Sequence, residues 1–179
     1  AEALEARAAG ARVVTHLFNA MSPVSHREPG LAGAALAGAF AAGLIADGVH
    51  VVPEVLRVVL AARAEGVFLV SDAMAFAGTD LAEMALGGRR ILRRDGRLTL
   101  ADGTLAGADL SLPQAVAVLV AAAGAAPARA LAMATSVPAA VAGLAGRAGH
   151  LAPGRAADMV HLGPDYSLRG VWRAGVSAL

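Results

Sequence analysis

The polar chemistry of this sequence begins in the segment Val13-Val14-Thr15-His16-Leu17-Phe18-Asn19-Ala20-Met21-Ser22-Pro23, where a short apolar run ends in a histidine. The same layout follows twice. Leu44-Ile45-Ala46 precedes Asp47-Gly48-Val49-His50, and Val67-Phe68-Leu69-Val70-Ser71 precedes Asp72. Near-continuous apolar runs are typical of parallel strands that are buried on both faces. Since sites in parallel sheets lie at the carboxyl ends of strands, we expect these polar groups to form one.

Helical patterns alternate with these strands, which predicts the α/β class. A glycine ends the first helix, and Pro53 fits the first turn of the third. The expected helices cover 1–9, 31–42 and 53–64, and the expected strands cover 12–16, 43–46 and 67–71.

The character of the sequence changes after Asp72. Two strand-like runs, 85–92 and 97–100, flank Asp95-Gly96 and predict a hairpin. Helical patterns return at 111–123, 127–135 and 138–144, and strands are expected at 158–162 and 170–173. We expect the strand-rich parts, 84–103 and 148–179, to pair into one small β domain, with 1–83 a partial (β/α) unit on which the helices of 104–147 pack.

Composition restricts the class of protein. The 179 residues are 57% hydrophobic and 16% charged, which suits a soluble globular domain with a sizeable core, and no apolar run is long enough to span a membrane. The net charge of +1 and the few aromatic residues argue against nucleic-acid binding. We interpret the arginine-rich run 89–97 as a solvated hairpin rather than a phosphate contact.

The sequence contains no cysteine, so any metal must be bound by nitrogen and oxygen atoms, and a reducing cytoplasm is the expected location. Residues 1–9 read as a helix already under way without a preceding cap. We therefore expect a chain truncated at its amino-terminal end.

Each strand-end residue has a functional and a structural interpretation. His16 is either a metal ligand or a hydrogen-bonded packing residue. Asp72 is either a functional carboxylate or a cap bonded into Met74 or Ala75. His50 either binds a ligand or caps the helix that Pro53 begins.

The loops leave similar alternatives open. Arg27 either holds a phosphate or carboxylate or pairs with Glu28 on the surface, and Asn19 either binds phosphate or satisfies its own turn. The segment 103–107 either presents backbone amides to a ligand or is an ordinary loop entering the helix near Ser111. We assign structural roles to three other histidines: His26, His150 and His161.

These segments together resemble the carboxyl-terminal half of the N-acetylglucosamine-6-phosphate deacetylases of the amidohydrolase superfamily. The resemblance rests on 15–23, His26-Arg27-Glu28-Pro29-Gly30, Ile45 to His50, Leu69 to Ala73 and Gly103 to Gly107, in family order and spacing. The stretch 149–158 is shared more widely by amidohydrolases. The resemblance implies the carboxyl-terminal part of a (β/α)₈ TIM-type barrel with a small β domain.

The resemblance also implies roles for residues. His16 would be a metal ligand and Asp72 the general acid/base. The substrate contacts would come from Asn19, Ala20, Arg27, Asp47, His50, Leu105, Ala106 and Gly107, with Arg27 reaching into a neighbouring subunit's site. The implied cofactor is one or two divalent metal ions, expected to be Zn, and the implied full-length assembly is a homodimer.

The implied reaction is metal-assisted hydrolysis of the acetamide of N-acetylglucosamine 6-phosphate, giving glucosamine 6-phosphate and acetate. The family's other metal ligands, a glutamate and a second histidine, lie on segments that this sequence does not include, so we expect the isolated chain to be inactive. Two alternatives stay open: another amidohydrolase, such as a dihydroorotase or deaminase, and a non-catalytic sugar-phosphate-binding fragment.

Overall fold

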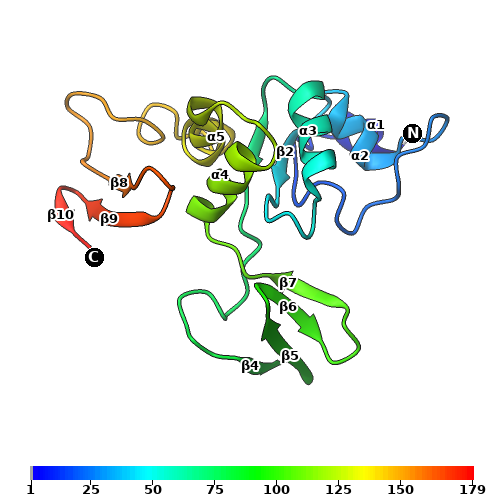
Figure 1. Cartoon of the computed structure of the whole chain (residues 1–179). Helices are drawn as coiled ribbons and strands as arrows, with labels where there is room; N and C mark the ends of the chain where they lie inside the picture. The colour runs from blue at the N-terminus through cyan, green and yellow to red at the C-terminus, as the bar shows by residue number, and fades with distance from the viewer. Residues whose placement is uncertain (1) are drawn as a thin grey trace.

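A computed structural model describes residues 2–179, and its first part alternates helices and strands as the sequence predicts. The three short strands pair in parallel, in the order β1-β2-β3, with Val14 beside Ala42 and Leu44 beside Leu69 (Figure 1). The elements are α1 (Glu2–Ala8), β1 (Val13–Val14), α2 (Gly30–Leu36), β2 (Ala41–Leu44), α3 (Pro53–Ala62) and β3 (Val67–Leu69).

The second part is a four-stranded antiparallel sheet, called here the small sheet. Its strands are β4 (Glu83–Leu86), β5 (Arg89–Arg94), β6 (Arg97–Leu100) and β7 (Leu105–Ala108), paired in sequence order. The predicted hairpin is confirmed, since Asp95 and Gly96 both adopt positive φ, as the tight turn requires. The interpretation of 103–107 as an ordinary loop is wrong, because Leu105–Ala108 pairs with β6.

Three helices follow the small sheet: α4 (Leu112–Ala121), α5 (Pro127–Ala134) and α6 (Ser136–Val141). Ser111 starts α4 with a capping box, in which its hydroxyl accepts from the Gln114 N–H and the Gln114 side chain accepts from the Ser111 N–H. Helices α5 and α6 both pack near β3. They therefore close one side of the parallel sheet.

The chain ends in a separate sheet of β8 (Met159–Leu162), β9 (Leu168–Arg173) and β10 (Val176–Ser177), called here the terminal sheet. The small and terminal sheets lie at different ends of the molecule (Figure 1), so the expectation that 84–103 and 148–179 pair into one β domain is wrong for the described residues. Each sheet pairs strands that are neighbours in the sequence, so its backbone hydrogen bonds form within one short segment of the chain. Helices α4, α5 and α6 lie between the two segments in the sequence.

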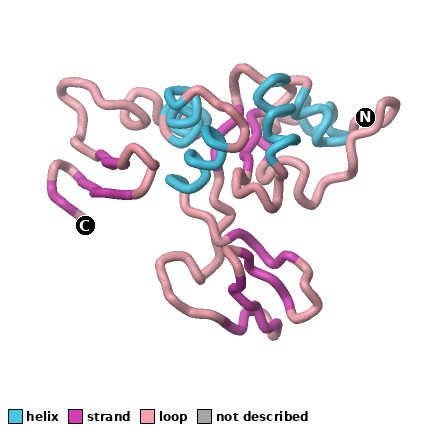
Figure 2. The backbone as a smooth tube through the Cα atoms, viewed as in Figure 1, coloured by secondary structure: helices cyan, strands magenta, loops and turns pink. Residues whose placement is uncertain are grey.

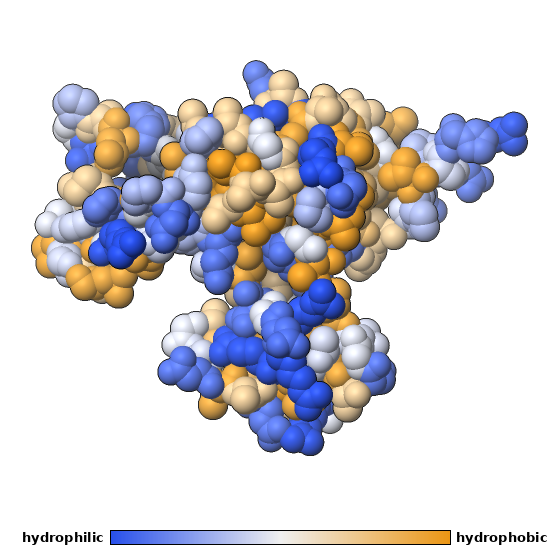
Figure 3. All heavy atoms as spheres, viewed as in Figure 1, coloured by the Kyte–Doolittle hydropathy of each residue, from blue (hydrophilic) through white to orange (hydrophobic). Residues whose placement is uncertain are grey.

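The main core lies between the parallel sheet and the helices. Leu17, Leu44, Ile45, Leu56 and Leu119 are completely buried there. A second, smaller core joins Phe76, Ile91 and Leu98 on one face of the small sheet, while the view in Figure 3 shows mainly hydrophilic side chains over that sheet. Within residues 2–179, no helix has both the length and the apolar character needed to cross a membrane.

The central strand β2 gives a stability prediction. Leu44→Ala should lower the free energy of unfolding by about 3 kcal/mol, because it leaves a cavity at a fully buried position. Urea unfolding followed by circular dichroism measures this change. The control Leu4→Ala, at a side chain that is 62% exposed, should change stability by less than about 0.5 kcal/mol. Equal losses in the two variants would contradict the placement of Leu44 in the core.

Candidate functional site

The predicted strand-end residues follow three parallel strands whose carboxyl ends share one edge of the sheet. The Leu17 N–H donates to the Gly43 carbonyl at 2.8 Å, and the Val70 N–H donates to the Leu44 carbonyl at 3.1 Å. His16 and Asp72 therefore leave the sheet at neighbouring levels on either side of β2. We call His16, Asp47, His50 and Asp72 the strand-end site.

His16 is held by its own turn. Its Nδ1 lies 2.9 Å from the carbonyl oxygen of Asn19, and its side chain is partly buried. When Nδ1 carries the proton and donates to this carbonyl, the lone pair of Nε2 is available to a ligand. Asn19 satisfies its own turn, as the structural interpretation expected, because its Nδ2 donates to the Leu17 carbonyl at 3.3 Å. Ala20 lies exposed in the same turn, with φ of 55°.

Asp47 and His50 form a tight, nearly buried pair. The Asp47 Oδ2 lies 2.6 Å from the His50 Nδ1, and the Asp47 Oδ1 accepts from the Val49 and His50 N–H groups at 2.8 Å each. Their side chains are 12% and 9% exposed. His50 is not a helix cap, since α3 starts after Val52 without a side-chain cap. Asp47 thus holds the His50 ring with one oxygen and the loop backbone with the other.

Asp72 lies exposed beyond β3, with φ of 49°, a conformation that non-glycine residues adopt uncommonly. No side-chain hydrogen bond to Met74 or Ala75 is present in the described structure, so the capping interpretation is not supported. Its carbonyl oxygen accepts from the Ala108 N–H at 3.2 Å, and Ala73 forms a parallel bridge with Ala108. The end of β7 therefore lies directly against the backbone of Asp72.

Gly107 makes this close approach possible. Its φ is 142°, and a Cβ atom there would lie 2.6 Å from the Met74 Cγ. Leu105 is exposed and Ala106 partly buried, and a hollow of about 530 Å³ beside them is bordered by Met74 and Leu105. The structure thus joins the predicted segment 105–107 to Asp72.

The turn before β7 is braced by Asp102. Its Oδ1 accepts from the Thr104 N–H at 2.9 Å, and hydrogen bonds from the Thr104 backbone and hydroxyl lower the pKa of the Asp102 carboxyl. The charged form of Asp102 therefore holds the turn that leads into the segment 105–107.

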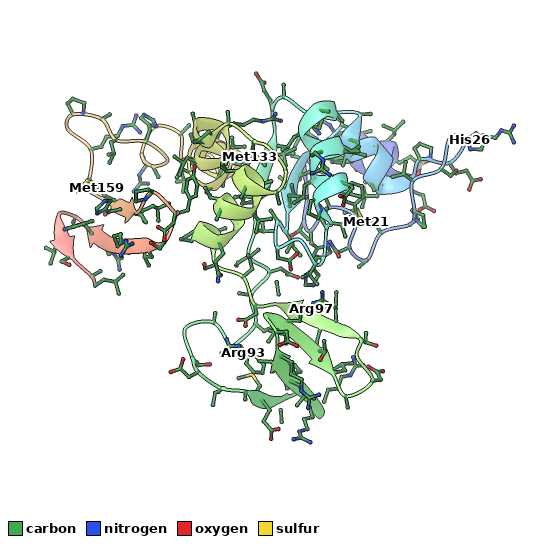
Figure 4. All side chains as sticks on the ribbon, viewed as in Figure 1. Met21, His26, Arg93, Arg97, Met133 and Met159 are labelled. Carbon is green, nitrogen blue, oxygen red and sulfur yellow. The ribbon has the colours of Figure 1, made fainter. Side chains whose placement is uncertain are left out.

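Arg27 has no hydrogen bond or ion pair to the other predicted site residues among residues 2–179. It is exposed on the loop between β1 and α2, and Figure 4 shows the adjacent His26 at the tip of that loop, pointing away from the body of the molecule.

The interpretation of the arginine run as solvated is wrong for Arg93, whose side chain is 21% exposed and paired with Asp109. The alternation of inward and outward side chains along β5 could have identified Arg93 as partly buried. Ile91 is buried, and side chains two residues apart share a face of a strand, so Arg93 lies on the apolar face. Arg90, on the other face, is exposed and pairs with Glu83.

The strand-end site fits one position of a metal site. The donor atoms are suitable for zinc, because His16 can present Nε2 to an ion. Residues 2–179 contain no group of three or more His, Asp or Glu side chains close enough to hold a metal ion. Since a zinc site takes three or four protein ligands, His16 would need ligands that this part of the chain does not supply.

The family model described as "Amidohydrolase family" matches residues 1–177, and the chain belongs to this family.

Its relatives define the group more narrowly. The N-acetylgalactosamine-6-phosphate deacetylase of Escherichia coli O157:H7 is 37% identical over 93% of this chain and 45% of its own length. The putative N-acetylgalactosamine-6-phosphate deacetylase of E. coli strain K12 is 37% identical over 89% of this chain and 96% of its own. The crystal structure of N-acetylglucosamine-6-phosphate deacetylase from Pasteurella multocida superposes with a TM-score of 0.93 at 31% identity, over 98% of this chain and 46% of that one. The chain thus spans about half of two of these relatives and nearly all of the third.

The contacts of Asp47 give a second prediction. Asp47→Ala should speed hydrogen exchange of the Val49 and His50 amides at least tenfold, because both lose a charged acceptor. Exchange measured by NMR gives the rates, and the ¹⁵N shifts of the His50 ring report its tautomer. Asp102→Ala is the matched control, since it removes the acceptor of a different turn. Unchanged exchange at Val49 and His50 after Asp47→Ala would rule out this role of the carboxylate.

Proposed function

We propose that this protein takes part in the metal-dependent hydrolysis of the acetamide of N-acetylglucosamine 6-phosphate, which yields glucosamine 6-phosphate and acetate. The observation that carries the proposal is the contact of Asp72 with the end of β7, at the sheet edge where β1 delivers His16. The deacetylase names of the relatives support the reaction class and include both the glucosamine and the galactosamine epimer.

The proposed architecture is the carboxyl-terminal part of a (β/α)₈ barrel, with β1 to β3 as its last strands. Parallel strands, alternating helices and polar groups at the carboxyl ends support it. In this arrangement, residues 1–83 form the last strands of the barrel, the helices of 104–147 pack on it, and the two strand-rich segments are additions to it.

Asp72 is the proposed general acid/base. As a carboxylate, it accepts a proton from the attacking water, and as the carboxylic acid it then donates that proton to the departing amine. Its exposed side chain has no competing hydrogen bond among the described residues, which leaves both oxygens free for these transfers.

The proposed sugar contacts come from β7 and from the loop that follows β2. The backbone of Leu105, Ala106 and Gly107 lies against Asp72, and His50 presents Nε2 from the next strand end while Asp47 orients its ring. Asp47 then acts on the sugar through His50, because its own oxygens are already occupied.

The proposed phosphate contacts are Asn19, Ala20 and Arg27. The exposed position of Arg27 suits a contact made across the interface of a homodimer, in which the loop reaches the neighbouring subunit's substrate.

The proposed cofactor is a divalent ion, with zinc expected, and one or two ions bound. His16 would hold it through Nε2, and the ion would polarise the acetyl carbonyl and acidify the attacking water. Since residues 2–179 supply no further cluster of ligands, we propose that these residues are inactive alone and act in the cytoplasm with ligands from elsewhere in the enzyme.

Asp72→Asn tests the acid/base role. In the full protein loaded with zinc, it should lower kcat on N-acetylglucosamine 6-phosphate by about 10²- to 10⁴-fold, because the amide cannot accept the proton. Circular dichroism and metal analysis should be unchanged. The control Asp80→Asn alters another exposed carboxylate and should retain full activity. Turnover of Asp72→Asn at the unmutated rate would refute the assignment.

Arg27→Ala tests phosphate recognition. It should raise KM for the phosphosugar about tenfold or more, because a hydrogen-bonded charge is lost, and leave KM for unphosphorylated N-acetylglucosamine nearly unchanged. Steady-state kinetics on both substrates give the comparison, with exposed Arg147→Ala as the control. Equal effects on the two sugars would mean that Arg27 does not recognise phosphate.

A further inference from the structure

The small sheet joins the rest of the molecule through two connections, which we call the neck: residues 73–82, which lead out from β3, and residues 109–111, which lead back to α4. Figure 2 shows both as loop segments. Loops of this kind do not by themselves fix the position of a sheet. The segment 105–107, which the proposed function assigns to sugar binding, belongs to the small sheet, while Asp72 belongs to the body.

Arg93 on β5 binds the outgoing part of the neck. Its Nη2 donates to the Phe76 carbonyl at 2.8 Å, and its Nη1 donates to the Thr79 carbonyl at 2.5 Å and the Leu81 carbonyl at 3.3 Å. Its guanidinium also lies over the Phe76 ring, 5.2 Å from the centroid. The fixed fork of donors on arginine suits such a set of carbonyls, and lysine could not reach them together. One side chain thus binds the loop that follows Asp72 at three carbonyls and one aromatic ring.

The same guanidinium binds the returning part of the neck. Its Nη2 donates to the Asp109 Oδ1 at 2.9 Å, and its Nε lies 2.8 Å from Oδ2 as an ion pair without an aligned hydrogen bond. The two side chains are 21% and 22% exposed, so the pair is partly shielded from water. Asp109 directly follows Ala108, whose N–H donates to the Asp72 carbonyl. Arg93 therefore ties both connections of the neck together beside the contact between Asp72 and β7.

We propose that Arg93, through Asp109, is a positioning residue that keeps the sugar-binding backbone of 105–107 in register with Asp72. The expected effect of Arg93 on catalysis rests on the proposed function. Its expected effect on the structure rests only on the contacts of Arg93. Figure 4 shows Arg93 between the loop that follows β3 and the strands of the small sheet. Removal of Arg93 releases three carbonyl contacts of the loop and leaves the Asp109 carboxylate without its counter-ion, so the neck loosens.

The structural arm of the test is hydrogen exchange in the full protein. Arg93→Met should speed exchange of the Ala108 amide at least tenfold, and leave the Ala42 amide, which donates to Gly66 within the parallel sheet, unchanged. Arg93→Lys, which keeps the charge but loses the fork, should give an intermediate increase. Arg90→Met is the matched control, because it removes an exposed arginine from the opposite face of the same strand and should alter neither amide.

The outcomes separate cleanly. A selective increase at Ala108 in Arg93→Met and Arg93→Lys supports the proposal. An equal increase at Ala108 and Ala42 would show that Arg93 serves overall stability, and no increase would show that the neck is held without it; either overturns the proposal. If Arg93→Met fails to fold, the comparison of Arg93→Lys with Arg90→Lys decides the question by the same amides.

The kinetic arm tests the consequence for catalysis. On N-acetylglucosamine 6-phosphate, Arg93→Met should lower kcat about tenfold with a smaller change in KM, since the acid/base and the sugar lose alignment while the phosphate contacts remain. Selective exchange at Ala108 with unchanged kcat would overturn the catalytic part of the inference. If the unmutated protein itself does not hydrolyse this sugar, the proposed function fails, and the exchange data still decide whether Arg93 holds the neck.

Discussion

The parallel pairing of β1, β2 and β3 is the constraint on which the rest of the structure depends. Because parallel strands have the same direction, whatever follows each of them must appear at the same edge of the sheet. The sheet is short, and its central strand is almost entirely buried, so the register of Leu44 with Leu69 leaves little freedom in where those polar residues emerge. The segments that bear His16, Asp47, His50 and Asp72 therefore all begin at this edge of the sheet, as a consequence of backbone pairing.

The site is then completed by an addition to the sheet. The chain enters the small sheet shortly after Asp72 and comes back to Asp72 at the end of β7. Gly107 and Ala108 therefore contact the segment that follows β3. A glycine at 107 permits the approach, and the contacts of Arg93 brace the two connections. The polar groups of the site are held mostly by their own loops: Asn19 holds His16, and Asp47 holds His50. Such local bonds orient side chains before a substrate binds.

The predictions from sequence were strongest where the signal was local. The alternation of helices and strands, the Asp95-Gly96 hairpin and the start of a helix near Ser111 are confirmed, because each depends on residues within one turn or one pair of strands. The predictions were weakest for pairing at a distance. The two strand-rich segments have similar patterns, and these patterns did not indicate that each segment forms a sheet of its own. Arg93 was predicted to be exposed like the other arginines of the run 89–97, because the prediction used the composition of that run. Composition does not reveal which face of a strand a residue occupies, whereas the alternation of side chains does.

The sequence by itself determined the α/β class, the residues that follow each strand and the family to which the chain belongs, because these depend on periodicity and on motifs that are continuous along the chain. The tertiary structure alone decided that β7 lies against Asp72, that Arg93 is enclosed by carbonyls and Asp109, and that the loop with His26 at its tip projects from the body of the molecule. These contacts join residues that are distant in sequence. Their geometry follows from how the sheets and loops pack, which no local pattern specifies.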